Sequence, residues 1–401
     1  MLKKIITLLL TIALTIPPLT AVTSNAEEIS PDKTPETTAQ TAPQSTPPEV
    51  ELTAPSALLM DYETGKVLFE KNSHDVRPCA SITKVMTLCL IFEAIESGKI
   101  GYDTIVTTSP MAAAMGGSDI WLVEGEQMSV NDLIKAIVVV SANDAAVAMA
   151  ECVSGSESAF VEEMNKKAAS LGMNDTTFKN CNGLDEDGHV TSAYDVALMS
   201  RELMKHDDIY NYTSIWLDYI RDGATQLVNT NKLLKTYDGI TGLKTGTTSK
   251  AGACITATAQ RNGLNLISVI LGAENTADRF TDAAKLLDYG FANYSSITPQ
   301  LPEENINTVE ISKGMQTEVN VQCNINGKFL MRKGSEENIT SEIIIMEDIT
   351  APISKGQELG RIVYKSENEI LGEFPVSAMQ DIAEINFKDV FALLFNSFIS
   401  F

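Results

Sequence analysis

Residues 80–98 read ASITKVMTLCLIFEAIESG, in which Ser81 and Lys84 precede apolar residues at helical spacing and Gly98 provides a stop. A helix that begins here places Ser81 and Lys84 one turn apart on the same face. Its N-terminus would present free N–H groups and the positive end of the helix dipole to negative charge that forms at Ser81. This arrangement suits a serine nucleophile, although a plain helix cap at Ser81 with a solvated Lys84 is the alternative.

A second polar motif, Ser141-Ala142-Asn143, interrupts the apolar stretch 128–153, MSVNDLIKAIVVVSANDAAVAMAECV. Apolar residues recur at helical spacing on both sides of it, which predicts two buried helices that meet near Ser141. A polar cluster at this junction can serve chemistry, or Ser141 or Asn143 can simply cap the second helix.

The third motif is Lys244-Thr245-Gly246, the only K-[ST]-G in the chain. It ends a predicted strand, residues 239–246 (GITGLKTG). Glycine in a strand lets the backbone of a ligand approach the strand edge closely. The motif is therefore a candidate for substrate binding.

Each motif is weak alone, because residues 30–33 (SPDK) and 366–368 (SEN) match the first two by chance. The combination is much more specific. Ser141 follows Lys84 by 57 residues, and Lys244 follows Asn143 by 101 residues. On a helix start, a helix junction and a strand respectively, these motifs form the active-site set of penicillin-binding proteins and β-lactamases.

Histidine does not provide the base in this interpretation. The chain has three histidines, and none lies in a catalytic sequence context. A serine hydrolase here therefore needs another base, and Lys84 is the candidate. A lysine that is desolvated near a second cation, here Lys244, can have its pKa lowered enough to accept a proton at neutral pH.

Residues 54–295 resemble a D-alanyl-D-alanine carboxypeptidase, a serine-type, low-molecular-mass penicillin-binding protein. Beyond the three motifs, the resemblance lies in GGSDIWLVEGEQMSVNDLIKAIVVVSANDAA (116–146), FVEEMNKKAASLGMNDTTFKNCNGLD (160–185) and RFTDAAKLLDYGF (279–291). It implies an α/β (α+β) penicillin-binding transpeptidase/β-lactamase-like domain, with an antiparallel sheet and a helical subdomain.

The resemblance also implies a mechanism. Ser81 would attack the carbonyl of the penultimate D-Ala of a peptidoglycan pentapeptide stem, expel the terminal D-Ala and leave an acyl-enzyme that water hydrolyses. Penicillin and other β-lactams would acylate the same serine. Lys84 would accept the Ser81 proton, and Ser141, hydrogen-bonded between Lys84 and Lys244, would relay a proton to the leaving amine.

Further residues receive binding roles from the same resemblance. Asn143 would orient Lys84 and bind the peptide amide of the substrate. The backbone N–H groups of Ser81 and Thr247 would form an oxyanion hole, worth roughly 3–4 kcal/mol per donor. The implied substrate-binding residues are Lys244, Thr245, Gly246, Thr247 and Arg279, of which the first two hold a strand that pairs with substrate and the last recognises the terminal carboxylate.

Three alternatives remain open at this level. A class A β-lactamase shares the motifs, but it needs a glutamate-activated water, and residues 176–180 (TTFKN) stand where an E-x-x-L-N would be sought. A DD-endopeptidase would use the same residues. A catalytically inert cell-wall-binding protein is the third, and the intact motifs argue against it.

The chain divides by composition into five parts. Residues 1–26 have a basic start, an apolar run and a small-residue site typical of a signal peptide, or of an uncleaved N-terminal anchor. Residues 27–52 predict a disordered Pro/Thr-rich tether. Residues 53–298 form the predicted peptidase domain, with hairpins at 62–65 and 261–263. Short β-rich runs in residues 299–386 predict an all-β domain.

The last part, residues 387–401, places an apolar stripe with four phenylalanines on one helical face. Fifteen residues are too few to span a bilayer, so we expect an amphipathic anchor that lies in the membrane interface, or a helix that docks on its own domain. The predicted location is extracytoplasmic, peripheral on the outer face of the cell membrane and in the cell wall.

Composition excludes several other classes. The 401-residue chain carries 30 Lys+Arg against 53 Asp+Glu, a formal charge of −23, which argues against nucleic acid as a partner. No C-x-x-C or H-x-x-x-H pattern occurs, so we expect neither a metal nor any other cofactor. The six cysteines are widely spaced, and we expect no disulfide framework.

Overall fold

The computed structural model describes residues 50–302, 306–325, 327–335, 339–366 and 369–399. The predicted signal peptide, 1–26, and the part of the predicted tether up to residue 49 lie outside this range. The described chain comprises a mixed region (residues 50–293) and a β region (residues 306–385). Strand β10 (Tyr294–Ile297) follows the mixed region and pairs with β13 (Phe329–Arg332) of the β region. The predicted fold class is confirmed: helices and an antiparallel sheet come first, and an all-β part follows.

A five-stranded antiparallel sheet forms the centre of the mixed region, in the order β2-β1-β9-β8-β7. Its strands are β1 (Ser56–Asp61), β2 (Val67–Lys71), β7 (Ile240–Thr248), β8 (Gly252–Arg261) and β9 (Leu264–Ala273). Both predicted hairpins are present, β1–β2 and β8–β9. Because β7 is the last strand in the order, its outer edge has no partner strand among the described residues.

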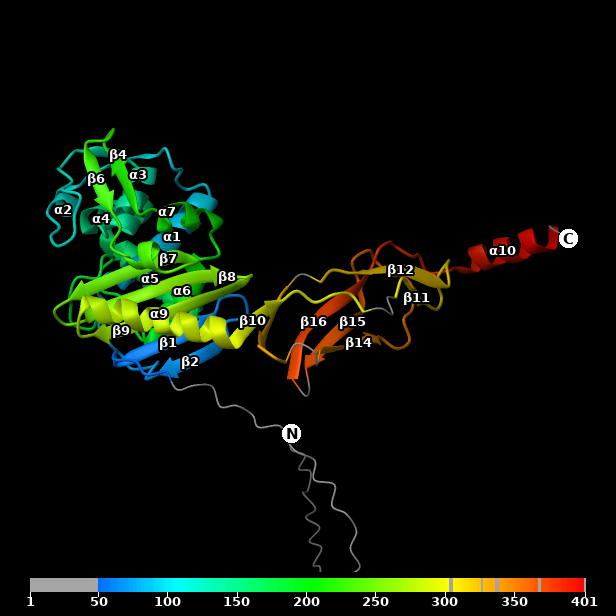
Figure 1. Ribbon diagram of the computed structural model, residues 1–401. Coiled ribbons are helices and arrows are strands. Elements are labelled where there is room, and N and C mark those ends of the chain that lie inside the picture. The colour runs from blue at the N-terminus through cyan, green and yellow to red at the C-terminus, as the bar shows by residue number, and fades with distance from the viewer. Residues whose placement is uncertain (1–49, 303–305, 326, 336–338, 367–368, 400–401) are drawn as a thin grey trace, which may run out of the picture. The chain divides into compact units, whose positions relative to one another are not determined.

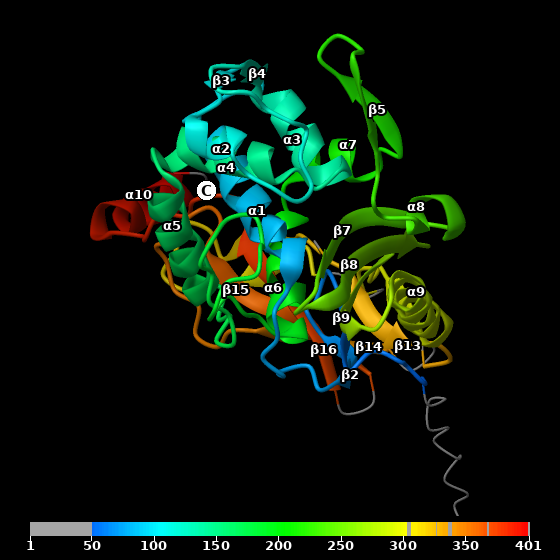
Figure 2. The ribbon, with the colours of Figure 1, turned by 90° about the vertical axis from the view of Figure 1, so that its left-hand side faces the viewer.

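Helices cover both faces of this sheet (Figure 1). They are α1 (Lys84–Glu96), α2 (Pro110–Ala113), α3 (Val130–Val139), α4 (Asn143–Ser154), α5 (Glu157–Ser170), α6 (Ala193–Leu203), α7 (Tyr210–Thr213), α8 (Leu233–Thr236) and α9 (Thr276–Asn293), with 3-10 turns η1 (Ala80–Thr83) and η2 (Asp207–Ile209). Helix α9 packs on β8 and β9, and α6 packs on β9 and β1 from the other side. Helices α2, α3, α4 and α7 lie beyond β7 in both views (Figures 1 and 2).

Two small hairpins complete the mixed region. They consist of β3 (Ile105–Thr107) with β4 (Gln127–Ser129) and of β5 (Leu217–Ile220) with β6 (Thr225–Val228). The buried apolar side chains form one large cluster around α1, α3, α4 and α6 and a second under α9. Helix α1 is apolar on almost all sides because it lies in the middle of the first cluster.

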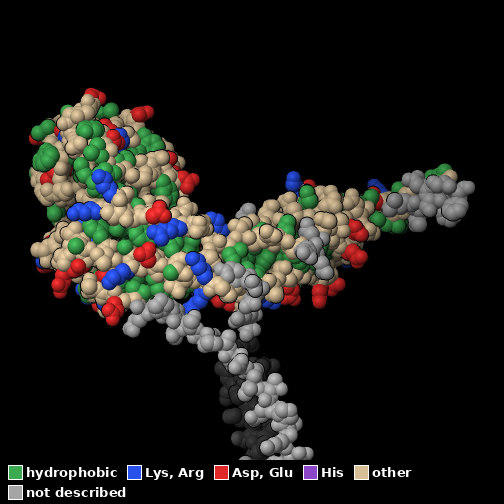
Figure 3. Space-filling view, in the orientation of Figure 1, with side chains coloured by type: hydrophobic (Ala, Val, Ile, Leu, Met, Phe, Trp, Pro, Cys, Tyr) green, Lys and Arg blue, Asp and Glu red, His purple; other side chains and the backbone are tan. Residues whose placement is uncertain are grey.

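The β region is a second antiparallel sheet, in the order β11-β12-β16-β15-β14. Its strands are β11 (Thr308–Glu310), β12 (Glu318–Cys323), β14 (Ile339–Ile345), β15 (Glu358–Ser366) and β16 (Glu369–Ala378). The sequence pattern missed β13 (Phe329–Arg332), which pairs with β10 (Tyr294–Ile297) directly after α9. Acidic side chains gather around β14 on the face shown in Figure 3, whereas Lys and Arg are scattered over the mixed region there.

The chain ends in helix α10 (Phe387–Ile399). Phe387, Phe391, Phe395 and Ile399 are exposed on it, as the predicted apolar stripe requires. No helix in the described part of the chain has the length and apolar character required to cross a bilayer. None of the six cysteines, all of them in described segments, is disulfide-bonded.

Candidate active site

The predicted nucleophile lies in a turn and not in the first turn of an α-helix. Ser81 belongs to η1, and α1 begins only at Lys84. Ala80 has the left-handed φ of +49°. Backbone packs closely around the turn, because a Cβ on Gly183 would lie 2.0 Å from the Ala80 carbonyl oxygen and one on Gly246 would lie 2.9 Å from the Ser81 nitrogen. The two glycines therefore permit an approach that no other residue allows.

Lys84 is fully buried, and its amine faces the serine. Its Nζ lies 3.0 Å from Ser81 Oγ, 2.5 Å from Asn143 Oδ1 and 2.6 Å from the Asn182 carbonyl oxygen. Burial lowers the pKa of Lys84 to about 7, while the electrostatic influence of Cys181, Asp119 and Asp144 opposes the shift. The alternative of a solvated lysine beside a capping serine is wrong, since neither η1 nor α1 has a side-chain cap.

The second motif meets the first at the junction of α3 and α4. Asn143 is the first residue of α4; its Oδ1 accepts from Lys84 and its Nδ2 donates to the Gly116 carbonyl oxygen at 2.7 Å. Ser141 is buried in a left-handed conformation with φ +64°. Neither residue caps α4 with its side chain. Ser141 Oγ has no hydrogen-bond partner among the described residues, so the bonds expected to Lys84 and Lys244 are not formed.

The third motif lies on β7, the edge strand. Lys244 is buried, and its Nζ donates to the Thr245 carbonyl oxygen at 2.8 Å. Burial lowers its pKa well below the ordinary lysine value, and the charges of Lys84 and Arg279 act in the same direction. Strand β7 packs against the η1 turn that carries Ser81, because a Cβ on Gly246 would lie 2.9 Å from the Ser81 nitrogen. Thr245 Oγ1 pairs with Thr230 Oγ1 at 2.7 Å.

Arg279 is not a surface charge. It is only 5% exposed, and its Nη1 donates to the Gly246 carbonyl oxygen at 3.0 Å and to Thr247 Oγ1 at 2.8 Å. Its Nε is buried without a partner in the described structure. The guanidinium thus stands behind the end of β7, where it adds positive charge beside the third motif.

The sequence motifs missed two groups that contribute to the structure of the site. The Asn182 carbonyl oxygen holds the Lys84 amine, but a main-chain acceptor leaves no signal in its own residue type. Asp144 accepts from the Ile120 and Leu122 nitrogens and so fixes the loop that carries Gly116. Asp144 directly follows the S-x-N motif, which was the signal available for it.

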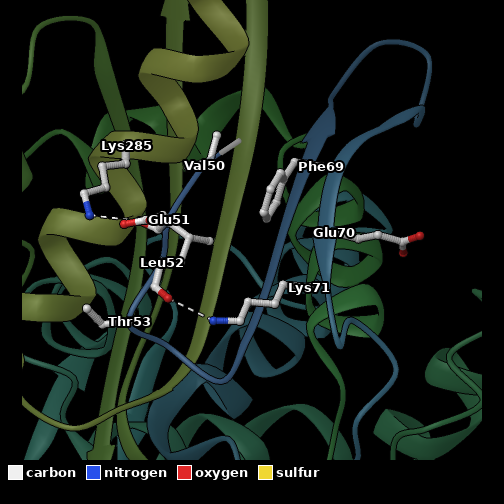
Figure 4. A pocket seen from close by; sticks show the side chains of 8 residues that line it. All are labelled: Val50, Glu51, Leu52, Thr53, Phe69, Glu70, Lys71 and Lys285. Carbon is white, nitrogen blue, oxygen red and sulfur yellow. Dashed lines mark hydrogen bonds between the residues drawn. The ribbon is translucent and has the colours of Figure 1, made fainter. Parts of the chain in front are cut away.

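A hollow with a volume of about 620 Å³ lies elsewhere in the mixed region (Figure 4). It is lined by Val50, Glu51, Leu52, Thr53, Phe69, Glu70, Lys71 and Lys285. Lys71 Nζ and Lys285 Nζ each donate at 2.9 Å to a carbonyl oxygen, of Leu52 and Glu51 respectively. Residues 50–52, assigned to the tether by composition, are therefore tied to β2 and α9. None of the predicted site residues lines this hollow.

The three motifs thus meet in one region: Lys84 Nζ lies 3.0 Å from Ser81 Oγ, Asn143 Oδ1 accepts from Lys84, and a Cβ on Gly246 would lie 2.9 Å from the Ser81 nitrogen. A buried amine whose pKa is lowered to about 7 is neutral in part at neutral pH and, 3.0 Å from a hydroxyl, can take its proton. No group of three or more His, Cys, Asp or Glu side chains suited to a metal occurs in the described segments. This arrangement is the one expected of an active-site serine enzyme of the penicillin-binding class.

Comparison with known proteins gives the family. Residues 39–275 match the family model of D-alanyl-D-alanine carboxypeptidases, and residues 294–384 match that of the C-terminal domain of penicillin-binding protein 5. The chain is 43% identical to the D-alanyl-D-alanine carboxypeptidase DacF of Bacillus subtilis, over 84% of this chain and 88% of the relative. It belongs to the D-alanyl-D-alanine carboxypeptidase family, as the sequence motifs predicted.

Solved structures agree with this assignment. Penicillin-binding protein 5 from Haemophilus influenzae superposes with a TM-score of 0.73 at 30% identity, covering 84% of this chain and 99% of that one. Penicillin-binding protein D2 from Listeria monocytogenes, in an ampicillin-bound form, gives a TM-score of 0.56 at 35% identity and covers 61% of this chain and 100% of its own. The fold and the enzyme class are therefore confirmed.

Proposed function

We propose that this enzyme removes the terminal D-Ala from peptidoglycan pentapeptide stems through an acyl-enzyme on Ser81. The Ser81 oxygen attacks the carbonyl carbon of the penultimate D-Ala. The bond to the terminal D-Ala breaks, that residue leaves as the free amino acid, and water then hydrolyses the ester. The observation that carries the proposal is the 3.0 Å contact between Ser81 Oγ and the buried Lys84 Nζ.

Lys84 takes the proton of the Ser81 hydroxyl as the ester forms. Its burial supports this role, because desolvation lowers the pKa of the amine to about 7 and leaves a large neutral fraction at neutral pH. Asn143 and the Asn182 carbonyl hold the amine in line with the hydroxyl. Ser141, whose hydroxyl is buried and free to turn, passes a proton to the leaving amine once substrate fills the site.

Substrate lies along the open edge of β7. The edge strand offers main-chain groups to an extended peptide, so the stem would add a strand to the sheet. The N–H groups of Ser81 and Thr247 would stabilise the oxyanion, and the Arg279 guanidinium beside Gly246 and Thr247 would favour the terminal carboxylate, with the Lys244 amine as a hydrogen-bond donor on the same strand. Thr245 and Gly246 complete the strand beneath the substrate.

β-Lactams would acylate Ser81 in the same way, and the adduct would be long-lived. A rapid β-lactamase needs a carboxylate that activates water for deacylation. The carboxylates whose charge acts on Lys84 are Asp119 and Asp144. Asp144 already accepts from the main-chain N–H groups of Ile120, Leu122 and Ala145, and Asp119 accepts from that of Asp144. This occupancy favours the carboxypeptidase over the β-lactamase.

Replacement of the nucleophile tests the function. Ser81→Ala should abolish labelling by a fluorescent penicillin and lower D-Ala release from a pentapeptide by on the order of 10⁵-fold, because no other oxygen replaces the nucleophile. Ser170→Ala, on the exposed end of α5, is the control and should retain both activities. D-Ala release by Ser81→Ala at the wild-type rate would refute the proposal. Cleavage of cross-linked dimers in preference to pentapeptides would instead indicate an endopeptidase.

We also propose an extracytoplasmic location, with residues 1–26 as an export signal and α10 as an interfacial anchor. The support for the anchor is the row of exposed apolar side chains, Phe387, Phe391, Phe395 and Ile399. Deletion of residues 387–401 should release the enzyme from phospholipid vesicles without changing its turnover in solution. Cosedimentation of the truncated enzyme with the vesicles at the full-length level would contradict the anchor.

A further inference from the structure

His189 is buried and hydrogen-bonded to the turn that carries Ser81, although no sequence motif indicates a role for it. The residue is 4% exposed and packs edge-on against the ring of Phe178 at 5.9 Å. Its Nε2 lies 2.6 Å from Thr83 Oγ1, and Thr83 is the last residue of η1. A side chain 106 positions away in the sequence thus contacts the turn of Ser81.

The hydrogen-bond directions follow from the geometry. The Lys179 main-chain N–H donates to His189 Nδ1 at 3.0 Å, so Nδ1 carries no proton and Nε2 is the donor toward Thr83. Thr83 Oγ1 in turn donates to the Ala80 carbonyl oxygen at 2.9 Å. The chain of donors therefore runs from Lys179 through His189 and Thr83 to Ala80, the residue before the nucleophile.

This chain ends at a strained point of the backbone. Ala80 holds a φ of +49°, which is unfavourable for a residue with a side chain and must be maintained by its surroundings. Its carbonyl oxygen lies against Gly183 and accepts from the Thr83 hydroxyl. The next residue, Ser81, supplies both the attacking oxygen and, in the proposed mechanism, one N–H of the oxyanion hole. A small rotation at Ala80 moves both groups.

We propose that His189 is a positioning residue for acylation, which holds the Ser81 turn through its hydrogen bond to Thr83. This inference rests on the proposed role of Ser81 as the nucleophile. His189 touches no reacting atom and acts only through Thr83. The neutral ring is the working form, because a proton on Nδ1 would face the Lys179 N–H, donor against donor.

The surroundings favour that neutral form. Burial lowers the pKa of His189 to about 4, Lys179 acts in the same direction, and the charges of Glu186 and Asp185 oppose it only in part. The position of the ring is fixed by main-chain bonds on both sides. The His189 nitrogen donates to the Glu186 carbonyl oxygen, and the neighbouring Val190 exchanges main-chain hydrogen bonds with Thr177.

The test measures acylation by a fluorescent penicillin, with separate determination of the binding constant and the acylation rate constant. In the full-length enzyme, His189→Leu removes the donor and Thr83→Val removes the acceptor. Each should lower the acylation rate constant about 10- to 100-fold, because a shift of the turn that carries Ser81 misplaces the attacking oxygen. The binding constant should stay within about twofold. The double variant should lose no more than either single one, since both break the same chain.

Two further variants separate positioning from simple loss of packing. His189→Gln keeps a donor toward Thr83 and an acceptor toward Lys179, and should restore most of the acylation rate. His206→Leu removes another buried imidazole, stacked on Phe92 and bonded to Glu96 at the far end of α1, and should leave the rate per folded molecule unchanged.

Four results would overturn the inference: unchanged acylation in His189→Leu, additive losses in the double variant, no rescue by His189→Gln, or an equal loss in His206→Leu. These outcomes are distinct from failure of the proposed function. If wild-type enzyme is acylated at Ser81 but releases no D-Ala, the proposed substrate is wrong, while the penicillin measurements still decide the role of His189.

Discussion

The mixed region and the β region bury different kinds of side chain. Every buried polar or charged residue in the described segments lies between Ser56 and Asp282, and the set includes Lys84, Lys244 and Arg279. In the described part of the β region the buried side chains are apolar, such as Val319, Ile362 and Val376. The mixed region therefore holds charged side chains away from water, whereas the described core of the β region contains apolar side chains.

Burial of a charged group costs free energy, so a buried ionisable side chain indicates a functional role or a compensating interaction. An ionised amine loses its hydration when it is buried, and the protein responds by lowering the pKa or by supplying hydrogen bonds. Lys84 shows both responses, with a pKa of about 7 and three oxygens around Nζ. The described part of the β-region core holds apolar side chains and Tyr364, whose hydroxyl donates to the Gln300 carbonyl oxygen, and no buried charge.

The largest expected difference in the acylation rate constant is between variants of one lysine in the mixed region and one lysine in the β region. Lys84→Ala should leave penicillin binding in place but lower the acylation rate constant about 10²- to 10⁴-fold, the usual contribution of a general base. Lys355→Ala removes an exposed lysine from the β region and is the matched control. Stopped-flow fluorescence measures both. Equal rates for the two variants would contradict the assignment of the base.

A core substitution in the β region should lower stability and leave acylation unchanged. Ile362 is 1% exposed in that core, so Ile362→Ala should destabilise the β region by about 2–5 kcal/mol through the cavity that it leaves. Hydrogen exchange of the β15 and β16 amides would record the loss. Acylation of Ser81 should be unchanged, and a parallel loss of acylation would show that the two regions are coupled in catalysis.

Periodicity predicted most of the fold. The hairpins at 62–65 and 261–263, helix α9 and most strands of the β region follow directly from alternation, helical spacing and Asn-Gly or Gly turns. Strand β13 was missed because its partner is β10, which follows α9 and belongs to a two-stranded ladder of its own. Such a pairing depends on the tertiary structure, and four residues carry no period of their own.

The site was only partly predictable. Residue type and spacing were enough to select Ser81, Lys84 and Asn143, whose side chains the structure brings into hydrogen-bond contact. The 3-10 turn at Ala80–Thr83 was missed, since its strained backbone is maintained by Gly183 and Gly246 from distant segments. The missing hydrogen bonds of Ser141 could not be foreseen either, because they depend on side-chain geometry that spacing does not determine.

The central claim is that the amine of Lys84, in its neutral form, takes the proton from Ser81. The most direct measurement is the second-order rate constant for acylation of the wild-type enzyme by a penicillin between about pH 5 and pH 9. Burial lowers the pKa of Lys84 to about 7, and only the unprotonated amine accepts a proton, so the rate should rise about tenfold per pH unit below pH 7 and level off above it. A profile that stays flat across pH 7 would contradict the account.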